Sequence, residues 1–121
     1  MDLKLALPQW LYSGTNTGAG QTLGPGPVGQ RSWLIIGIDL YPTTQPNNGH
    51  MEVGIQFGGV GSSVIFSVQQ SQNFPGPFSW RGLIPFGGTG TTAPLDNLYT
   101  EGLIPFDFSV WGLVVPSFSQ V

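Results

Sequence analysis

The chain has 121 residues, which suits a single domain. Asp, Glu, Lys and Arg make up only 7% of it, whereas ordinary soluble domains carry roughly 25%. With 40% hydrophobic and 12% aromatic residues, the composition excludes a disordered chain. The 19 glycines and 11 prolines predict a folded domain that is rich in turns.

Charge and cysteine content exclude several classes of function. The formal net charge is −3, and the three basic residues, Lys4, Arg31 and Arg81, are too scattered to form a nucleic-acid-binding stripe. Cysteine is absent, so disulfides and thiolate metal sites are excluded. No apolar run approaches the roughly 20 residues of a membrane helix, and the N-terminus lacks the pattern of a signal peptide. We therefore expect neither nucleic acid nor a membrane as a partner.

The first 30 residues predict an arm and a tether. In residues 2–7, leucines at every second position indicate a short strand, which Pro8 ends. Residues 1–12 are interpreted as an N-terminal arm, and residues 13–30, rich in Gly, Pro and Thr, as a flexible linker. Such a linker spans roughly 20–25 Å, enough to reach a neighbouring subunit. The alternative is that the arm folds back as an edge strand on its own domain.

The remaining residues, 31–121, predict a β core domain. The clearest strand covers residues 51–57, where Met51, Val53 and Ile55 alternate with polar or small residues. No stretch shows helical periodicity, and turn-rich segments separate the strands. The fold class predicted is all-β, an antiparallel jelly roll or β-sandwich of six to eight strands with an extended N-terminal arm. The core strands are expected at residues 32–41, 51–57, 63–69, 78–84 and 106–115.

Chemistry-bearing residues form no recognisable catalytic motif. His50 is the sole histidine and lies beside a Gly-Asn turn, so we interpret it as a turn residue. The six acidic residues are not clustered in the sequence. We expect no enzymatic activity, no metal and no cofactor. Two alternatives remain open: a carboxylate pair of a small secreted hydrolase, and a calcium site within residues 96–101.

Aromatic residues supply the candidate binding sites. The candidate interface lies on the predicted arm, where large apolar side chains suit a docking anchor, and comprises Trp10, Leu11 and Tyr12 with Leu3 and Leu5. A second candidate surface, for a sugar or a subunit, comprises Trp80, Arg81 and Trp111. The alternative for both sets is that they fill the core of the sandwich.

Two segments carry a resemblance to a known group of proteins. Residues 80–85 read Trp-Arg-Gly-Leu-Ile-Pro, and residues 106–116 read Phe-Asp-Phe-Ser-Val-Trp-Gly-Leu-Val-Val-Pro. With the strands expected upstream, this pattern resembles the small jelly-roll or β-sandwich structural proteins of tailed bacteriophages, which are head decoration, head fibre or minor tail proteins. The resemblance covers roughly residues 31–116.

The resemblance implies a structural role in a virion assembled in the host cytoplasm. It implies a capsid decoration (cement) or minor capsid protein that stabilises the shell through contacts with itself, as a homotrimer, and with the major capsid protein or other virion proteins. The alternative is a tail-tip or head-fibre module that binds host-surface carbohydrate. A surface of uncharged polar residues suits permanent assembly, because it costs little desolvation when it is covered.

Overall fold

The computed structural model describes residues 7–28, 31–44, 48–58, 61–87 and 96–116, and within these ranges it contains strands and no helix. The strands, in chain order, are β1 (Gln9–Asn16), β2 (Gly20–Leu23), β3 (Arg31–Pro42), β4 (Gly49–Phe57), β5 (Gly61–Gln70), β6 (Phe78–Gly87), β7 (Asn97–Gly102) and β8 (Phe106–Pro116). The predicted all-β class is confirmed.

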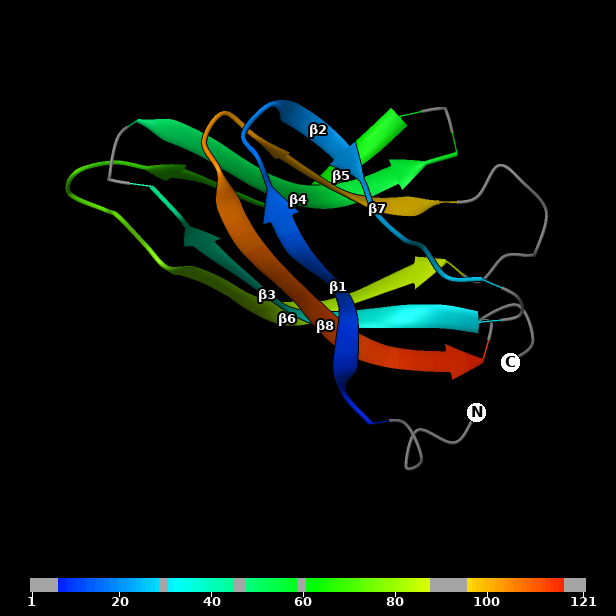
Figure 1. Ribbon diagram of the computed structural model, residues 1–121. Helices are drawn as coiled ribbons and strands as arrows, with labels where there is room; N and C mark the ends of the chain where they lie inside the picture. The colour runs from blue at the N-terminus through cyan, green and yellow to red at the C-terminus, as the bar shows by residue number, and fades with distance from the viewer. Residues whose placement is uncertain (1–6, 29–30, 45–47, 59–60, 88–95, 117–121) are drawn as a thin grey trace.

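The strands form two antiparallel four-stranded sheets that lie as two layers (Figure 1). Sheet A has the order β1-β8-β3-β6, and sheet B has the order β2-β7-β4-β5. Among the consecutive strands described, only β4 and β5 pair with each other, and each of the other six connections passes from one sheet to the other. Strands from both ends of the described chain therefore lie side by side, because β1 pairs with β8.

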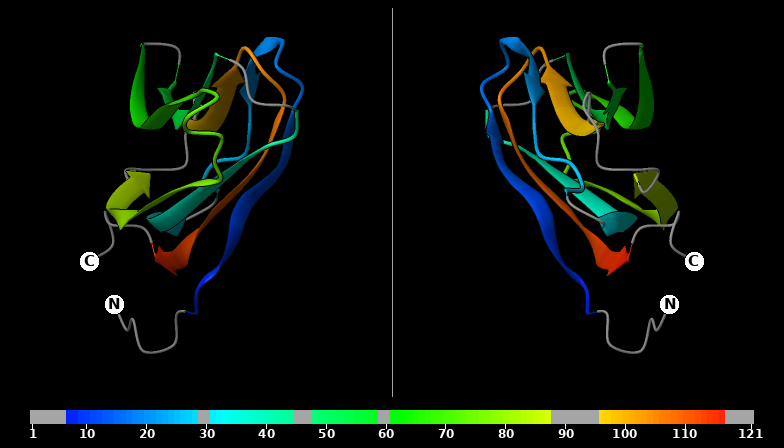
Figure 2. Two further views of the ribbon diagram at one scale, coloured as in Figure 1. Left: turned by 90° about the vertical axis from the view of Figure 1, so that its left-hand side faces the viewer. Right: turned by 90° about the vertical axis from the view of Figure 1, so that its right-hand side faces the viewer.

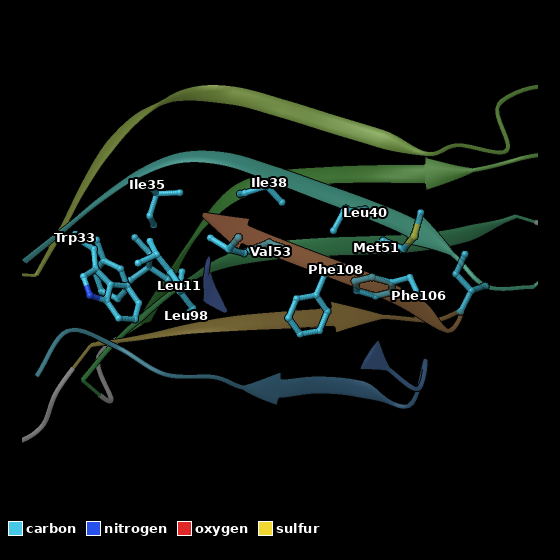
Figure 3. Close-up of a cluster of buried hydrophobic side chains, with 14 residues drawn as sticks. Leu11, Trp33, Ile35, Ile38, Leu40, Met51, Val53, Leu98, Phe106 and Phe108 are labelled. Carbon is cyan, nitrogen blue, oxygen red and sulfur yellow. The ribbon is translucent and has the colours of Figure 1, made fainter. Parts of the chain in front are cut away.

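The core lies between the two sheets (Figure 3). Successive residues of a strand point to opposite faces, so alternating apolar residues supply the inward side chains. Sheet A contributes Ile35, Ile38 and Phe106, and sheet B contributes Met51 and Val53, all of them buried. Burial of large apolar side chains of this kind stabilises the fold by roughly 1.5–3 kcal/mol each.

The five predicted core strands are confirmed, with one difference at β6. The sequence predicts that this strand ends before Pro85, yet β6 continues to Gly87. Proline lacks a backbone N–H, but β6 is an edge strand of sheet A and, among the described strands, pairs only with β3. An edge strand tolerates proline, because one side of its backbone has no partner strand.

The N-terminal residues differ from the predicted arm and linker. Strand β1 pairs with β8 and β2 pairs with β7, so residues 13–16 and 20–23 of the expected flexible linker are paired strand. The side chain of Asn16 is buried and its Nδ2 donates to Thr100 Oγ1 at 3.0 Å, which fixes the turn from β1 to β2. For residues 9–12 the structure matches the alternative of an edge strand on the same domain. Residues 1–6 lie outside the described residues.

Candidate binding surface

A row of side chains crosses the outer face of sheet A. Trp10 on β1 lies opposite Trp111 on β8. Gly37 on β3 lies opposite Trp111 on one side and Arg81 of β6 on the other. Paired residues of neighbouring strands share a face, so these four residues, which we call the tryptophan patch, line one surface.

Gly37 allows the Trp111 indole to lie on the sheet. A Cβ atom at Gly37 would stand 2.2 Å from Nε1 and 2.4 Å from Cε2 of Trp111. Any side chain at position 37 would therefore push the ring away from β3. The pairing registers shift between Ile35 and Gly37, a β-bulge at the same place. Bulges of this kind redirect side chains locally.

Arg81 is held beside the Trp111 ring. Its Cζ atom lies 5.2 Å from the ring centroid, within the range of a cation–π interaction. Its Nη2 donates to Asp39 Oδ1 at 3.0 Å, and its Nη1 donates to the Trp80 carbonyl at 2.8 Å. Ser79 Oγ donates to the same carboxylate oxygen at 2.7 Å. These bonds fix the guanidinium and pair its charge.

Trp10 is the most exposed aromatic residue of the patch. Its ring meets the Trp111 ring edge to face, at a centroid distance of 6.4 Å and an interplanar angle of 74°. Although this contact holds it against the sheet, 64% of Trp10 remains exposed. An aromatic residue that is held in place and still exposed loses little conformational freedom on binding a partner, which is typical of binding surfaces.

The surroundings of the patch divide into an apolar and a polar side. Leu34 and Leu113 lie opposite each other on the apolar side and are partly exposed. Leu83, two residues beyond Arg81 on β6, is 64% exposed. On the other side Ser13 lies opposite Ser109, so hydroxyl groups adjoin the indoles. The patch therefore offers apolar contact and hydrogen-bonding groups together.

The structure brings together residues that the sequence predicts in two separate sets. Trp10 belongs to the expected interface, and Arg81 and Trp111 belong to the expected exposed surface, yet all three lie on one face. Trp80 does not join them: it points inward and packs against the hydrophobic core. Trp80 therefore follows the alternative of a core residue.

The rest of the expected interface is not on this surface. Leu11 is buried in the core, and the Tyr12 ring packs on the Phe108 ring at a centroid distance of 4.5 Å. Burial also raises the pKa of the Tyr12 hydroxyl. Both side chains point into the sandwich and pack there. Leu3 and Leu5 lie outside the described residues.

A polar cluster lies on the outer face of sheet B. His50 is in β4, not in a turn as the sequence predicts, and its Nε2 lies 3.0 Å from Glu52 Oε1. Tyr99 Oη donates to Glu52 Oε2 at 2.5 Å. Burial, and next the bond to the Glu52 carboxylate and its charge, raise the pKa of Tyr99 far above its ordinary value. Glu101 lies opposite Glu52 on β7.

The polar cluster is internally bonded. Both oxygens of Glu52 have a partner, so the carboxylate is already occupied by His50 and Tyr99. Among the residues that the structure describes, no three His, Cys, Asp or Glu side chains gather as metal ligands would. Asp96 precedes β7 and Glu101 is within it, so the segment considered for calcium is largely an extended strand. The tryptophan patch is the stronger candidate site.

The comparisons with known proteins do not assign the chain to a family. It matches no protein-family model, no curated protein and no solved structure. Within the described ranges there is no helix of the length and apolar character needed to span a membrane. The function must therefore be inferred from the fold and the surface.

Proposed function

We propose that this chain is a virion structural protein of a bacteriophage, a capsid decoration or minor capsid protein that acts as a homo-oligomer through protein–protein contacts. The observation that carries the proposal is the strand order, in which β1-β8-β3-β6 faces β2-β7-β4-β5. This strand order supports a jelly roll, an architecture used by viral capsid proteins and lectins. Support from a fold is an analogy, so the surface must agree with it.

The surface is suited to being covered by other proteins. Many large apolar side chains are exposed, on both sheets and in the segments outside the strands: Leu7, Trp10, Leu23, Val28, Tyr41, Phe57, Val64, Phe74, Leu83 and Leu103. Ion pairs neutralise part of the small charge of the surface. Arg81 pairs with Asp39, and a protonated His50 side chain would pair with Glu52. Covering such a surface removes apolar area from water and strips few charges of their hydration.

The tryptophan patch has the composition of a contact centre. Tryptophan and arginine are the residues most enriched where single side chains dominate the energy of an interface. Here Trp10, Trp111 and Arg81 are adjacent, and the apolar residues Leu34, Leu83 and Leu113 lie beside them. We propose that another virion protein covers this patch.

Mass spectrometry and electron cryomicroscopy of particles made by the genome that encodes the chain test this proposal. We expect the chain in the particles in a fixed number of copies, with density on the shell. Trp10→Ser should lower its occupancy at least tenfold, whereas Leu23→Ser, which alters a similarly exposed residue on sheet B, should not. Absence of the chain from purified particles would overturn the proposal.

A second candidate function is favoured by the hydroxyl groups beside the indoles. Sugars bind by stacking on an exposed aromatic ring while neighbouring polar groups bond to their hydroxyls, and Trp10 adjoins Ser13 and Ser109. As a tail-tip or head-fibre module, the chain would bind host-surface carbohydrate here. Glycan-array binding that Trp10→Ala and Trp111→Ala abolish, while Leu23→Ser preserves it, would favour this function.

A further inference from the structure

Strand β5 is an edge strand whose residues 66–70, beyond a bulge at Ile65, lack the usual protection against pairing. It has ten residues, Gly61–Gln70, with neither a charged residue nor a proline. It pairs with β4 on one side, and among the described residues no strand pairs with its other side. Backbone N–H and C=O groups on an open edge are a template for another strand, which proteins usually block with charge, proline or short length.

The other edge strands differ from β5. Strand β6 contains both Arg81 and Pro85, and β2 has only four residues, Gly20–Leu23. Strand β1 is also uncharged and, like β5, contains a bulge, but its inward Leu11 is buried. Among the described edge strands, only β5 combines a long uncharged edge with an inner face that is incompletely covered.

The two layers diverge toward the side formed by β5 and β6 (Figure 2). Several inward side chains on this side are only partly buried, whereas Phe86 of β6 and most of those on the central strands are buried. The partly buried ones are Phe66 and Val68 on β5, and Phe78, Trp80 and Ile84 on β6. Extending sheet B by further strands beyond β5 would cover them. The uncovered apolar area and the open edge of β5 thus both favour the addition of further strands beyond β5.

We propose that the edge of β5 pairs with β5 of a second copy of the chain, antiparallel and about a two-fold axis. Residues 66–70 are in unbroken register with β4, and the bulge of β5 lies just outside this segment, at Ile65. With the axis at Val68, this residue lies opposite Val68 of the second copy. Sheet B then continues across the axis as one eight-stranded sheet.

A second copy suits this edge because the pairing is self-complementary. A single patch serves both subunits in a two-fold interface, and antiparallel copies of one segment present N–H groups to C=O groups in both directions. The edge carries no charge, so two identical edges approach without repulsion. The inference rests on the homo-oligomer of the proposed function, and it predicts two-fold pairing in place of the trimer that the phage resemblance implies.

Sedimentation velocity and hydrogen exchange of the full chain test this pairing. We expect the mass of two chains, or of an even multiple, and slower exchange of the amides of residues 66–70 at high than at low protein concentration. Ser67→Lys should raise the dissociation constant at least tenfold, because Ser67 is exposed and two copies of the new ammonium lie diagonally across the axis. Gln21→Lys adds the same charge at the opposite edge of sheet B and should not.

Any one of three results would overturn the pairing. These results are a mass of one or three chains, a Ser67→Lys variant that associates as the wild type does, and exchange in residues 66–70 that is independent of concentration. Circular dichroism of the Ser67→Lys variant serves as the control, because it distinguishes loss of association from loss of folding. Because this test needs no particle, a monomer that still decorates shells would refute the pairing alone, and a β5-paired dimer absent from particles would refute the virion role alone.

Discussion

At the scale of single residues, Gly37 determines the shape of the tryptophan patch. The Trp111 indole occupies the space that a side chain at position 37 would fill. We expect Gly37→Ala to lower the free energy of unfolding by about 1–3 kcal/mol, the usual cost of forcing an extra carbon into a packed site. Urea denaturation measures this loss, and the near-ultraviolet circular dichroism of the tryptophans should change with it.

A double-mutant cycle tests the cause of that loss. If the clash is with the indole, Gly37→Ala should cost much less when Trp111→Leu has already removed the ring. An equal cost in both backgrounds would contradict the packing of Trp111 on Gly37.

Tyr99 makes stability depend on alkaline pH. Its pKa in the folded chain is raised above the unfolded value of about 10, chiefly by burial and then by Glu52. Folding therefore favours the neutral phenol, and this contribution is complete below about pH 10 and is lost as the pH rises through the range between the two pKa values. We expect the free energy of unfolding to fall more steeply above pH 10 in the wild type than in Tyr99→Phe. Denaturant titrations from pH 9 to 12 measure both slopes, and parallel slopes would contradict the assignment.

At the scale of elements, the sequence predicts strands where an alternating apolar face is long. Strands β3, β4, β5, β6 and β8 are of this kind. Strands β2 and β7 are not predicted, and β1 is predicted only by the alternative of an arm that folds back as an edge strand. The extended conformation of these strands depends more on pairing, of β1 with β8 and of β7 with β2 and β4, than on their own side chains. In β1 the bulge next to Leu11 also breaks the alternation.

The candidate site is predictable only in part for the same reason. Its exposed aromatic residues can be found individually, but their adjacency depends on the registers of β1 and β6 relative to β8 and β3. Alternation places Trp80 and Arg81 on opposite faces without showing which face is inside. Phe78 and Trp80 have a larger apolar area than Ser79 and Arg81, so their face of β6 turns inward and packs against the core.

Strand β1 contributes to the core through Leu11, and shortening this side chain measures the contribution. Leu11 is 9% exposed and packs with the core cluster, whereas Leu7 is 75% exposed. We expect Leu11→Ala to lower the free energy of unfolding by about 2–4 kcal/mol and Leu7→Ala by less than about 0.5 kcal/mol. Thermal and urea denaturation compare the two variants. Equal, small effects would instead indicate an arm that is tethered and not packed.

At the scale of the whole molecule, low charge and apolar exposure have a common consequence. The net charge is only −3, and the ion pair of Arg81 with Asp39 lies within one chain. Long-range attraction or repulsion between copies is therefore weak, and association must come from apolar burial and backbone pairing. Neither depends on charges that salt can screen.

Self-association should therefore be nearly independent of salt. The screening length falls from roughly 10 Å at 0.1 M to roughly 3 Å at 1 M, a change that weakens interfaces held by surface charge. We expect the dissociation constant of the homo-oligomer, from sedimentation equilibrium in 0.05 M and 0.5 M NaCl, to differ by less than about threefold. An increase of tenfold or more in high salt would mean that charge–charge contacts hold the subunits together. It would move the interface away from the uncharged edge of β5, because that strand has no group for salt to screen.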